Sequence, residues 1–445
     1  MIREKERFEK MESEKIQMEN GKIQVENETS PALKRSRFMY ICEAALEYLI
    51  AILVSGSFLA TLTKSLGMSD SLTGVLSSVI SLGCLFQLLS AVYRRQQVKR
   101  FVIILSVFNQ LLFMLLYVIP LAGGGKQLKI VAFTVVIILA YLLYNIAHPK
   151  KISWLMALVE DGHRGRFTAN KEIVSLVIGM AFSFSMGVVV DYFSGRNEIR
   201  TAFALSGGVI FVLMILHTVT MALAVERPVE HVERRSFREN LQDVLNNKNI
   251  AKVSLVFVLY NIATYLAMPF YGTYQIHELG FSLKLVSAFT MLGSIVRILV
   301  SRFWGSYADK RTFAEMVEKC LLILGVGYLC AAFAVPSNGR ILFAGYYICH
   351  GVAQGGINSA LINLIFDYVT PDKRADSLAI CQAGAGIAGF LTTLAVSPLV
   401  SAIQQNGNTL WGLPIYAQQV LSAAALILTV LTVVFVRRRV ILPEK

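Results

Sequence analysis

The chain has 445 residues, of which 55% are hydrophobic and only 16% are charged. With a mean hydropathy of +0.58, this composition excludes a water-soluble globular protein, whose surface needs more charge. The net charge of +13 is compatible with a nucleic-acid partner. However, the basic residues alternate with long apolar stretches, so we expect a lipid bilayer and no nucleic acid.

The predicted elements begin after a charged amino-terminal tail, residues 1–37, which lacks the apolar core of a secretory signal. Twelve apolar stretches follow, each about long enough to cross a bilayer as a helix. They lie at residues 38–62, 69–92, 101–121, 129–148, 168–192, 201–224, 251–274, 283–304, 315–335, 341–367, 376–401 and 414–436. The sequence therefore predicts an all-α integral membrane protein with twelve transmembrane helices.

The first predicted helix carries two ionisable residues, Glu43 and Glu47, one helical turn apart. Counted from Phe38 at 1.5 Å per residue, Glu43 lies about 8 Å deep and Glu47 about 14 Å deep, near the membrane midplane. A carboxyl group in apolar surroundings loses hydration when it ionises, so such a group can take up and release a proton. We expect Glu47 to bind a proton or solute, with a structural hydrogen bond as the alternative. For Glu43 we favour the structural role.

The basic loops fix the expected topology. The runs YRRQQVKR, EDGHRGR, ERRSFREN, ADKR, TPDKR and VRRRV all fall on the side of the charged amino terminus if the helices alternate. Cytoplasmic loops carry an excess of Lys and Arg. We therefore predict a multi-pass protein of the cytoplasmic membrane, with both termini in the cytoplasm.

A long polar segment, residues 225–250, divides the apolar stretches into two sets of six. Corresponding loops of the two sets are separated by nearly the same number of residues. One pair follows the second and eighth stretches, at Ala91 and Gly305, and the other follows the fourth and tenth, at Arg164 and Arg374. This repetition predicts two six-helix bundles, residues 38–224 and 251–436, followed by a basic tail at 437–445. Transporters that rock two halves around a central site have this organisation.

Two short motifs resemble a known family. The stretch GSYADK, with Gly305, Asp309 and Lys310, resembles the GxxxD(R/K) loop of the major facilitator superfamily. The stretch PKKISWLMALVEDGHRGRF, with Arg164 and Arg166, is similar to the region between the fourth and fifth helices of bacterial members, although Glu160 stands where proline is usual. The resemblance covers essentially residues 38–436 and implies this family's fold of two six-helix repeats and secondary transport.

The loop residues are candidates for conformational gating. A carboxylate such as Asp309 can accept hydrogen bonds from a helix amino terminus and pair with a basic residue of a neighbouring helix. Breaking these contacts of Asp309 would shift the equilibrium between the inward-open and outward-open states of a transporter. We assign Arg164, Arg166 and Arg374 to the corresponding loops. For Lys310, simple anchoring of the loop by its charge is the favoured alternative.

Further polar residues at membrane depth are candidates for a solute or proton site because polar groups there usually face a cavity. Arg297 is the only Lys or Arg placed well inside a stretch, and it should have an acidic partner, a bound anion or access to water. The other candidates are Gln87, Asn261, His350, Gln354 and Gln382. Asn261 has Tyr260 and Tyr265 beside it, a combination that suits a sugar or drug cavity, although aromatic stripes more often serve packing.

Together these features predict a secondary transporter, with proton-coupled uptake of a small polar solute, a sugar or an organic acid, as the favoured function. The fifth stretch, VIGMAFSFSMGVVVDYF, lacks the proline of the GPxxGG-like motif of drug antiporters, but efflux remains a close alternative. A membrane sensor with the same fold and a multispan enzyme are alternatives from other classes. No GxxxxGK(S/T) loop or HExxH motif is present in the sequence. We expect no cofactor, no metal and a monomer.

Overall fold

The computed structural model describes residues 31–83, 98–159, 164–226, 242, 246–369, 374–410 and 412–441. We call residues 31–226 the first half and residues 246–441 the second half. Gln87 and most of the segment 225–250 lie outside the described residues, as does the tail up to residue 30. The side chains of Arg164, Arg166, Asp309 and Arg374 also lie outside the description.

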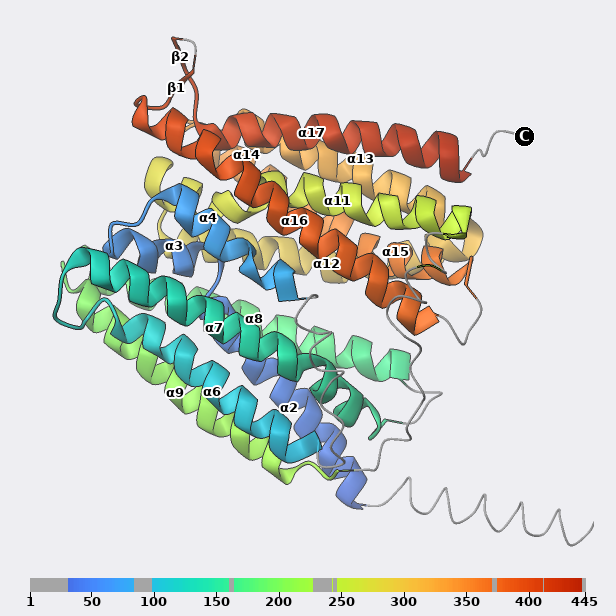
Figure 1. Cartoon of the computed structure of the whole chain (residues 1–445), viewed down its shortest axis with the longest axis horizontal. Helices are drawn as coiled ribbons and strands as arrows, with labels where there is room; N and C mark the ends of the chain where they lie inside the picture. The colour runs from blue at the N-terminus through green and yellow to red at the C-terminus, as the bar shows by residue number, and fades with distance from the viewer. Residues whose placement is uncertain are drawn as a thin grey trace, which may run out of the picture.

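The first half is built of helices throughout its described residues. Its elements are α2 (Pro31–Leu53), α3 (Gly56–Ser65), α4 (Asp70–Ser78) with the 3₁₀ turn η1 (Val79–Leu82), α6 (Val98–Val118), α7 (Lys126–Met156), α8 (Arg164–Gly195) and α9 (Ile199–Leu223). In Figure 1 these helices run from blue to green and, apart from α3 and α4, fill the lower part of the view.

The second half is also helical, with one short hairpin. Its elements are α11 (Lys248–Thr273) with the π-turn η3 (Tyr274–Glu278), α12 (Leu283–Lys310), α13 (Phe313–Ala332), α14 (Gly339–Gln354), α15 (Ile357–Phe366), α16 (Arg374–Gln405), β1 (Thr409–Leu410), β2 (Leu413–Pro414) and α17 (Ala417–Val436) with the π-turn η5 (Arg437–Ile441). The two strands pair antiparallel, with Leu410 opposite Leu413.

The helices confirm the prediction of an all-α membrane protein. Among the described residues, eight helices are long and apolar enough to cross a bilayer, or nine if the bent pair α2–α3 counts as one span. A helix lies at each of the twelve predicted stretches, but the full count of twelve spans stays a prediction. Large apolar side chains such as Ile341 and Leu299 are 79% and 71% exposed, as expected for helices whose outer faces meet lipid.

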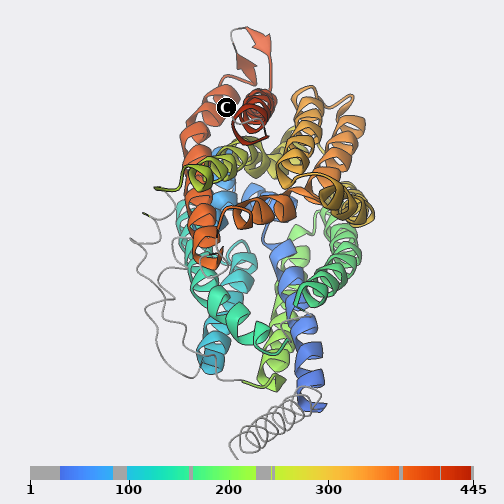
Figure 2. The same cartoon turned by 90° about the vertical axis from the view of Figure 1, so that its right-hand side faces the viewer.

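The buried apolar residues form separate cores in the two halves. One core runs through the second half, around Phe270, Tyr328 and Phe343. Two others lie mainly in the first half, one around Leu53 and Phe133, which also includes Leu283 of α12, and a smaller one around Trp154 and Tyr40. Figure 2 shows the two groups of helices one above the other. The exact domain boundaries and the six-helix repeat stay predictions.

Two of the predicted helices are broken. The first is bent by 40° between α2 and α3, where Gly56 adopts a φ of +53°, a conformation that favours glycine. The tenth ends at Gln354 and resumes at Ile357. Broken helices at membrane depth are tolerated where the interrupted backbone is buried in protein or lines a cavity.

Three helix ends differ from the prediction. GSYADK was expected in a loop, but Gly305, Asp309 and Lys310 belong to the last two turns of α12, because the helix ends only at Lys310. The next helix then begins directly after Thr312, whose hydroxyl accepts a hydrogen bond from the Glu315 amide at 3.2 Å. Similarly, Arg164 and Arg374 are the first residues of α8 and α16, so those basic motifs begin helices.

Hydrogen bonds between the two halves gather at one end of the bundle. We call this the hairpin end, because it holds β1 and β2 together with the starts of α4 and α12 (Figure 1). Here Asp70 Oδ1 lies 2.5 Å from His277 Nδ1, and Asp70 Oδ2 accepts from Gln404 at 2.7 Å. Asp191 accepts from the amides of Leu283 and Lys284 at 2.9 and 2.7 Å. We call the opposite end, with Pro31 and Val436, the tail end.

Candidate functional site

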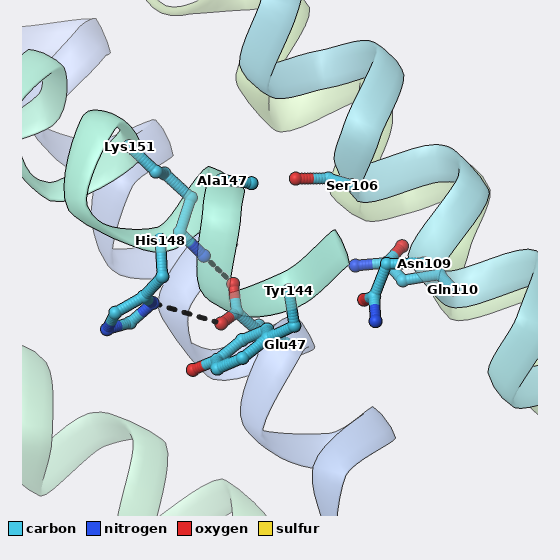
Figure 3. Close-up of a pocket in the computed structure, with 8 residues that line it drawn as sticks. All are labelled: Glu47, Ser106, Asn109, Gln110, Tyr144, Ala147, His148 and Lys151. Carbon is cyan, nitrogen blue, oxygen red and sulfur yellow. Dashed lines mark ion pairs between the residues drawn. The ribbon is translucent and has the colours of Figure 1, made fainter. Parts of the chain in front are cut away.

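The two glutamates of the first helix lie at the centre of a buried charged cluster in the first half. Lys151 Nζ, on α7, lies 2.7 Å from Glu43 Oε1 and also contacts Glu47 Oε2. Glu43 is 2% exposed and the Lys151 side chain 7%, whereas Glu47 is 18% exposed. Figure 3 shows Glu47 between Lys151 and His148. We call Glu43, Glu47, His148, Lys151 and His217 the carboxylate cluster.

His217, on α9, joins the cluster from the opposite side. Its Nε2 lies 3.1 Å from Glu43 Oε1 and 3.6 Å from Glu47 Oε2. Gln110 of α6 approaches the other ring nitrogen, with its Nε2 3.0 Å from His217 Nδ1. With the amide in this orientation, Gln110 Nε2 donates to His217 Nδ1 and His217 Nε2 donates to Glu43.

The charges in direct contact do not balance. Two carboxylates share one ammonium group, that of Lys151. Lys171 of α8 lies nearby but is directed at Tyr40, with its Nζ 4.8 Å from the ring centroid and 3.5 Å from the hydroxyl. Buried charges are stable only when they are paired. The cluster therefore has room for one further positive charge, and a proton is the smallest.

The same atoms offer a spacing that suits a metal ion. Glu43, Glu47 and His217 each present one ligand atom, and these atoms lie within 4.8 Å of one another. However, the Lys151 ammonium contacts both carboxylates. A divalent cation would have to displace it, so the donor set favours a lysine-bridged proton site over a metal site.

A water-sized cavity of about 10 Å³ adjoins Glu47. Its wall includes Ser106, Asn109 and Gln110 of α6 and Tyr144 and His148 of α7 (Figure 3). Two polar atoms of this wall, Gln110 Oε1 and His148 Nδ1, are buried and have no hydrogen-bond partner among the described residues. His148 Nδ1 lies 3.9 Å from Glu47 Oε1. A single water here could link Glu47 to His148.

Arg297 has an acidic partner, which is one of the three alternatives that the sequence left open for it. Its guanidinium forms an ion pair with Glu172 of α8. This pair crosses from the second half to the first. The side chains are 31% and 49% exposed, so the pair is partly solvated. It satisfies the expectation of a counterion and places Arg297 outside the carboxylate cluster.

A second and larger cavity, of about 520 Å³, lies mainly in the second half. The predicted residue Asn261 lines it, together with Tyr260 and Tyr265 of the same helix. Gln354 lies behind this wall, where its Nε2 donates to Tyr260 Oη at 2.8 Å. The remaining lining residues come from η1, α11, α15 and α16, and they are Ser81, Phe257, Thr264, Asn358, Leu361, Ile362, Gln382, Ala385 and Gly386. We call this the central cavity.

The other predicted residues are more scattered. His350 stacks on Tyr346 with ring centroids 5.5 Å apart, and its Nε2 has no hydrogen-bond partner among the described residues. It lines neither of the two cavities. Lys310 is exposed at the end of α12. The roles of Gly305, Asp309, Arg164, Arg166 and Arg374 in gating stay predictions.

Three members of the cluster, namely His148, Lys151 and His217, are not among the site residues predicted from the sequence. The expectation that Arg297 is the only Lys or Arg well inside a span was wrong. The predicted fourth stretch ends at residue 148, before Pro149, whereas α7 continues through this proline to Met156. As a result Lys151 lies within the helix and is only 5% exposed. His217 was visible as a lone ionisable residue in the apolar stretch GVIFVLMILHTVTMAL.

Comparisons with known proteins agree with this architecture. A family model described as the Major Facilitator Superfamily matches residues 39–318. No match was found among curated proteins.

Solved structures resemble the chain in fold. A variant of the nucleoside transporter NupG is 12% identical, with a TM-score of 0.72 over 90% of this chain and 99% of that one. A D-xylose-proton symporter is 12% identical, with a TM-score of 0.63 over 89% and 96% of the two chains. A bacterial metal transporter is 13% identical, with a TM-score of 0.62 over 92% and 98%.

Proposed function

The chain belongs to the major facilitator superfamily and is a multi-pass membrane transporter, and from this premise we propose that it moves a small polar solute by proton-coupled alternating access. The carboxylate cluster is the proposed proton site, and the central cavity is the proposed solute site. In the predicted topology the hairpin end faces outward, and both solute and proton move into the cell.

The observation that carries the proposal is the charge imbalance of the carboxylate cluster. Two carboxylates share one lysine; Glu43 is buried, whereas Glu47 is half-buried and lies beside a water-sized cavity. Glu43 is almost fully buried, and its Oε1 accepts from both Lys151 and His217. We therefore assign proton uptake and release to Glu47, with His148 as the relay, and charge compensation to Lys151.

The cross-half contacts support the alternating-access part of the proposal. Asp70 and Asp191 of the first half accept hydrogen bonds from the second half, and these bonds hold the hairpin end closed. Transport requires these contacts to break while the tail end closes. A change in the charge of Glu47 acts on α2 and α7, which belong to the half that moves against α11 and α12.

The proton role is tested with Glu47→Gln in liposomes, using labelled D-xylose, uridine and succinate as probes. For any probe that wild type accumulates under an imposed pH gradient, we expect accumulation to fall by about tenfold or more in the variant, because the titrating group is gone. Exchange of the same probe at equal pH on both sides should remain within about twofold, since exchange needs no net proton movement.

Glu318→Gln is the matched control, because Glu318 is a buried glutamate of α13 outside the cluster. It should keep gradient-driven accumulation. Accumulation by Glu47→Gln that equals wild type and still follows the pH gradient would refute proton coupling at Glu47. A gradient of opposite sign driving transport would identify efflux, and binding of a probe without any exchange would identify a sensor.

A further inference from the structure

The central cavity carries an inference about the chemistry of the solute. We propose that it binds an uncharged solute with a ring and several hydroxyl or amide groups, as in a sugar or a nucleoside, and that it rejects organic acids. This inference rests on the proposed function, because it takes the cavity to be the solute site. The sequence alone predicted a sugar or an organic acid as the solute without preferring either, and this inference favours the sugar.

The size of the cavity fits a small solute. Its volume is about 520 Å³, within the range of about 300 to 1,000 Å³ that is usual for small-molecule sites. Ser81 of the first half contributes to the wall, and the other lining residues belong to the second half. A solute bound here would contact both halves, as a site between two moving bodies must.

Aromatic rings line one side of the central cavity. Phe257, Tyr260 and Tyr265 all lie on α11 and belong to the wall. Tyr260 is held in place, since its hydroxyl accepts from Gln354 Nε2 at 2.8 Å. Aromatic rings stack on flat faces and on the apolar faces of sugar rings. The wall therefore favours a solute with a ring.

Amide side chains face the same cavity. Asn358 and Gln382 line it and are exposed, although both lie in apolar helices. Gln382 makes no hydrogen bond to the described part of the chain. Asn358 uses one amide hydrogen for Gln354 Oε1 at 3.3 Å, and Asn261 uses one for the Phe257 carbonyl at 3.0 Å. Each amide offers both donors and acceptors. Such groups match hydroxyl and amide groups, which also donate and accept.

Charged groups are absent from the described lining of the cavity. Neither Arg297 nor Lys151 lines this cavity, and both are already engaged, since Arg297 pairs with Glu172 and Lys151 pairs with the two glutamates. An anionic solute would lose hydration in the cavity without gaining a counter-charge, which is costly. An uncharged polar solute exchanges its hydration for hydrogen bonds to the amides at little cost. The cavity therefore selects against organic acids.

Equilibrium binding at fixed pH tests this inference on the detergent-purified full chain. The probes are D-xylose, D-glucose, uridine and adenosine, set against lactate and succinate, and the measurement is the shift in melting temperature followed by calorimetric titration. We expect at least one neutral probe to bind and neither acid to bind at concentrations up to about 10 mM.

Two variants and a matched control locate the site. Asn358→Leu and Gln382→Leu should each weaken binding of the neutral probe by about threefold to tenfold, because each removes a hydrogen-bonding partner. Asn363→Leu lies on the same helix, α15, but outside the cavity lining, and it should bind as wild type does. The melting temperature of each variant without probe shows whether it is folded.

The outcomes separate this inference from the proposed function. Binding of an acid in preference to every neutral probe, or no binding of any neutral probe, overturns the inference. Binding that survives both cavity variants in folded protein also overturns it. Neutral binding that depends on Asn358 and Gln382, but without flux in liposomes, would uphold the inference while the proposed transport fails.

Discussion

At the scale of single residues, Lys151 determines whether the carboxylate cluster is stable. Its ammonium group is buried and contacts both glutamates. If it is removed, two carboxylates remain at membrane depth with no cation in contact. The free energy of leaving buried charges unpaired greatly exceeds that of losing an exposed ion pair.

We therefore expect Lys151→Met to lower the free energy of unfolding by about 3 to 5 kcal/mol. The measurement is thermal unfolding in detergent. Lys126→Met, at the exposed start of the same helix, should have little effect. Adding Glu43→Gln to Lys151→Met should recover much of the loss, and a double variant no more stable than the single one would contradict this account.

The ion pair between Arg297 and Glu172 should behave differently, because both side chains are partly exposed. We expect the coupling between the two charges to be about 1 kcal/mol or less, measured by a double-mutant cycle with Arg297→Met and Glu172→Gln. The charge-swapped pair, Arg297→Glu with Glu172→Arg, should transport. If Arg297→Met abolishes solute binding and Glu172→Gln does not, Arg297 contacts the solute and the counterion role is wrong.

The sequence predicted part of this residue-level picture. Two glutamates one turn apart in an apolar stretch had to face protein or a cavity, and the structure places both against Lys151 and His217. Lys151 itself was missed because a proline followed by two lysines is typical of a cytoplasmic loop. The helix continues through Pro149, and the local pattern gives no sign of that continuation.

At the scale of elements, the break between α14 and α15 depends on close packing. A Cβ added at Gly356 would lie 2.7 Å from Trp304 Cγ and 2.8 Å from Met316 Cε. Both neighbours are buried, so they have little freedom to move aside. Gly305, in α12, is the opposite case, since an added Cβ would meet nothing within 4 Å.

These surroundings predict effects of opposite sign. Gly356→Ala should destabilise the protein by about 1 to 3 kcal/mol through overpacking. Gly305→Ala should stabilise it by about 0.5 to 1 kcal/mol, because alanine restricts the unfolded chain in a helix interior. Unfolding of the two variants under the same conditions checks both. A destabilised Gly305→Ala would instead give this motif glycine a packing role.

Element positions were predictable, whereas their breaks and ends were not. Apolar length determines where a helix crosses the membrane, so a helix lies at each predicted stretch. The break at Gly355 and Gly356 depends on contacts with Trp304 and Met316, which are distant in sequence. The end of α12 at Lys310 depends on the cap of the next helix at Thr312.

At the scale of the whole molecule, the proposed transport cycle requires the two halves to separate at the hairpin end. Ser183 of α8 and Ser287 of α12 mark this interface, with their hydroxyl oxygens 3.2 Å apart. Side chains this close allow a disulfide when both are replaced by cysteine. Such a bond would hold the hairpin end closed.

In a background without the six native cysteines, we expect oxidised Ser183→Cys/Ser287→Cys to lose about 90% or more of the exchange activity of a probe that wild type exchanges. Reduction should restore it. Ser185→Cys/Ser287→Cys is the control, because Ser185 is exposed on another face of α8 and should not cross-link. Full exchange in the cross-linked protein would show that this end does not open.

The division into two halves stays a prediction from the sequence, where a polar segment and basic loops mark it. The arrangement of the halves was not predictable. It depends on pairs such as Asp70 with His277 and Ser71 with Ser397, in which short polar side chains lie far apart along the chain. No local pattern indicates which of them will meet.

The contact between Asp191 and the start of α12 has a consequence for the energetics of opening. The first amide groups of a helix have no partner within the helix, and here Asp191 accepts from those of Leu283 and Lys284. When the halves part at this end, the carboxylate and both amides must be hydrated together. Water molecules are thus reactants in the opening step, and osmolytes that lower water activity should slow the transport cycle by favouring the closed hairpin end.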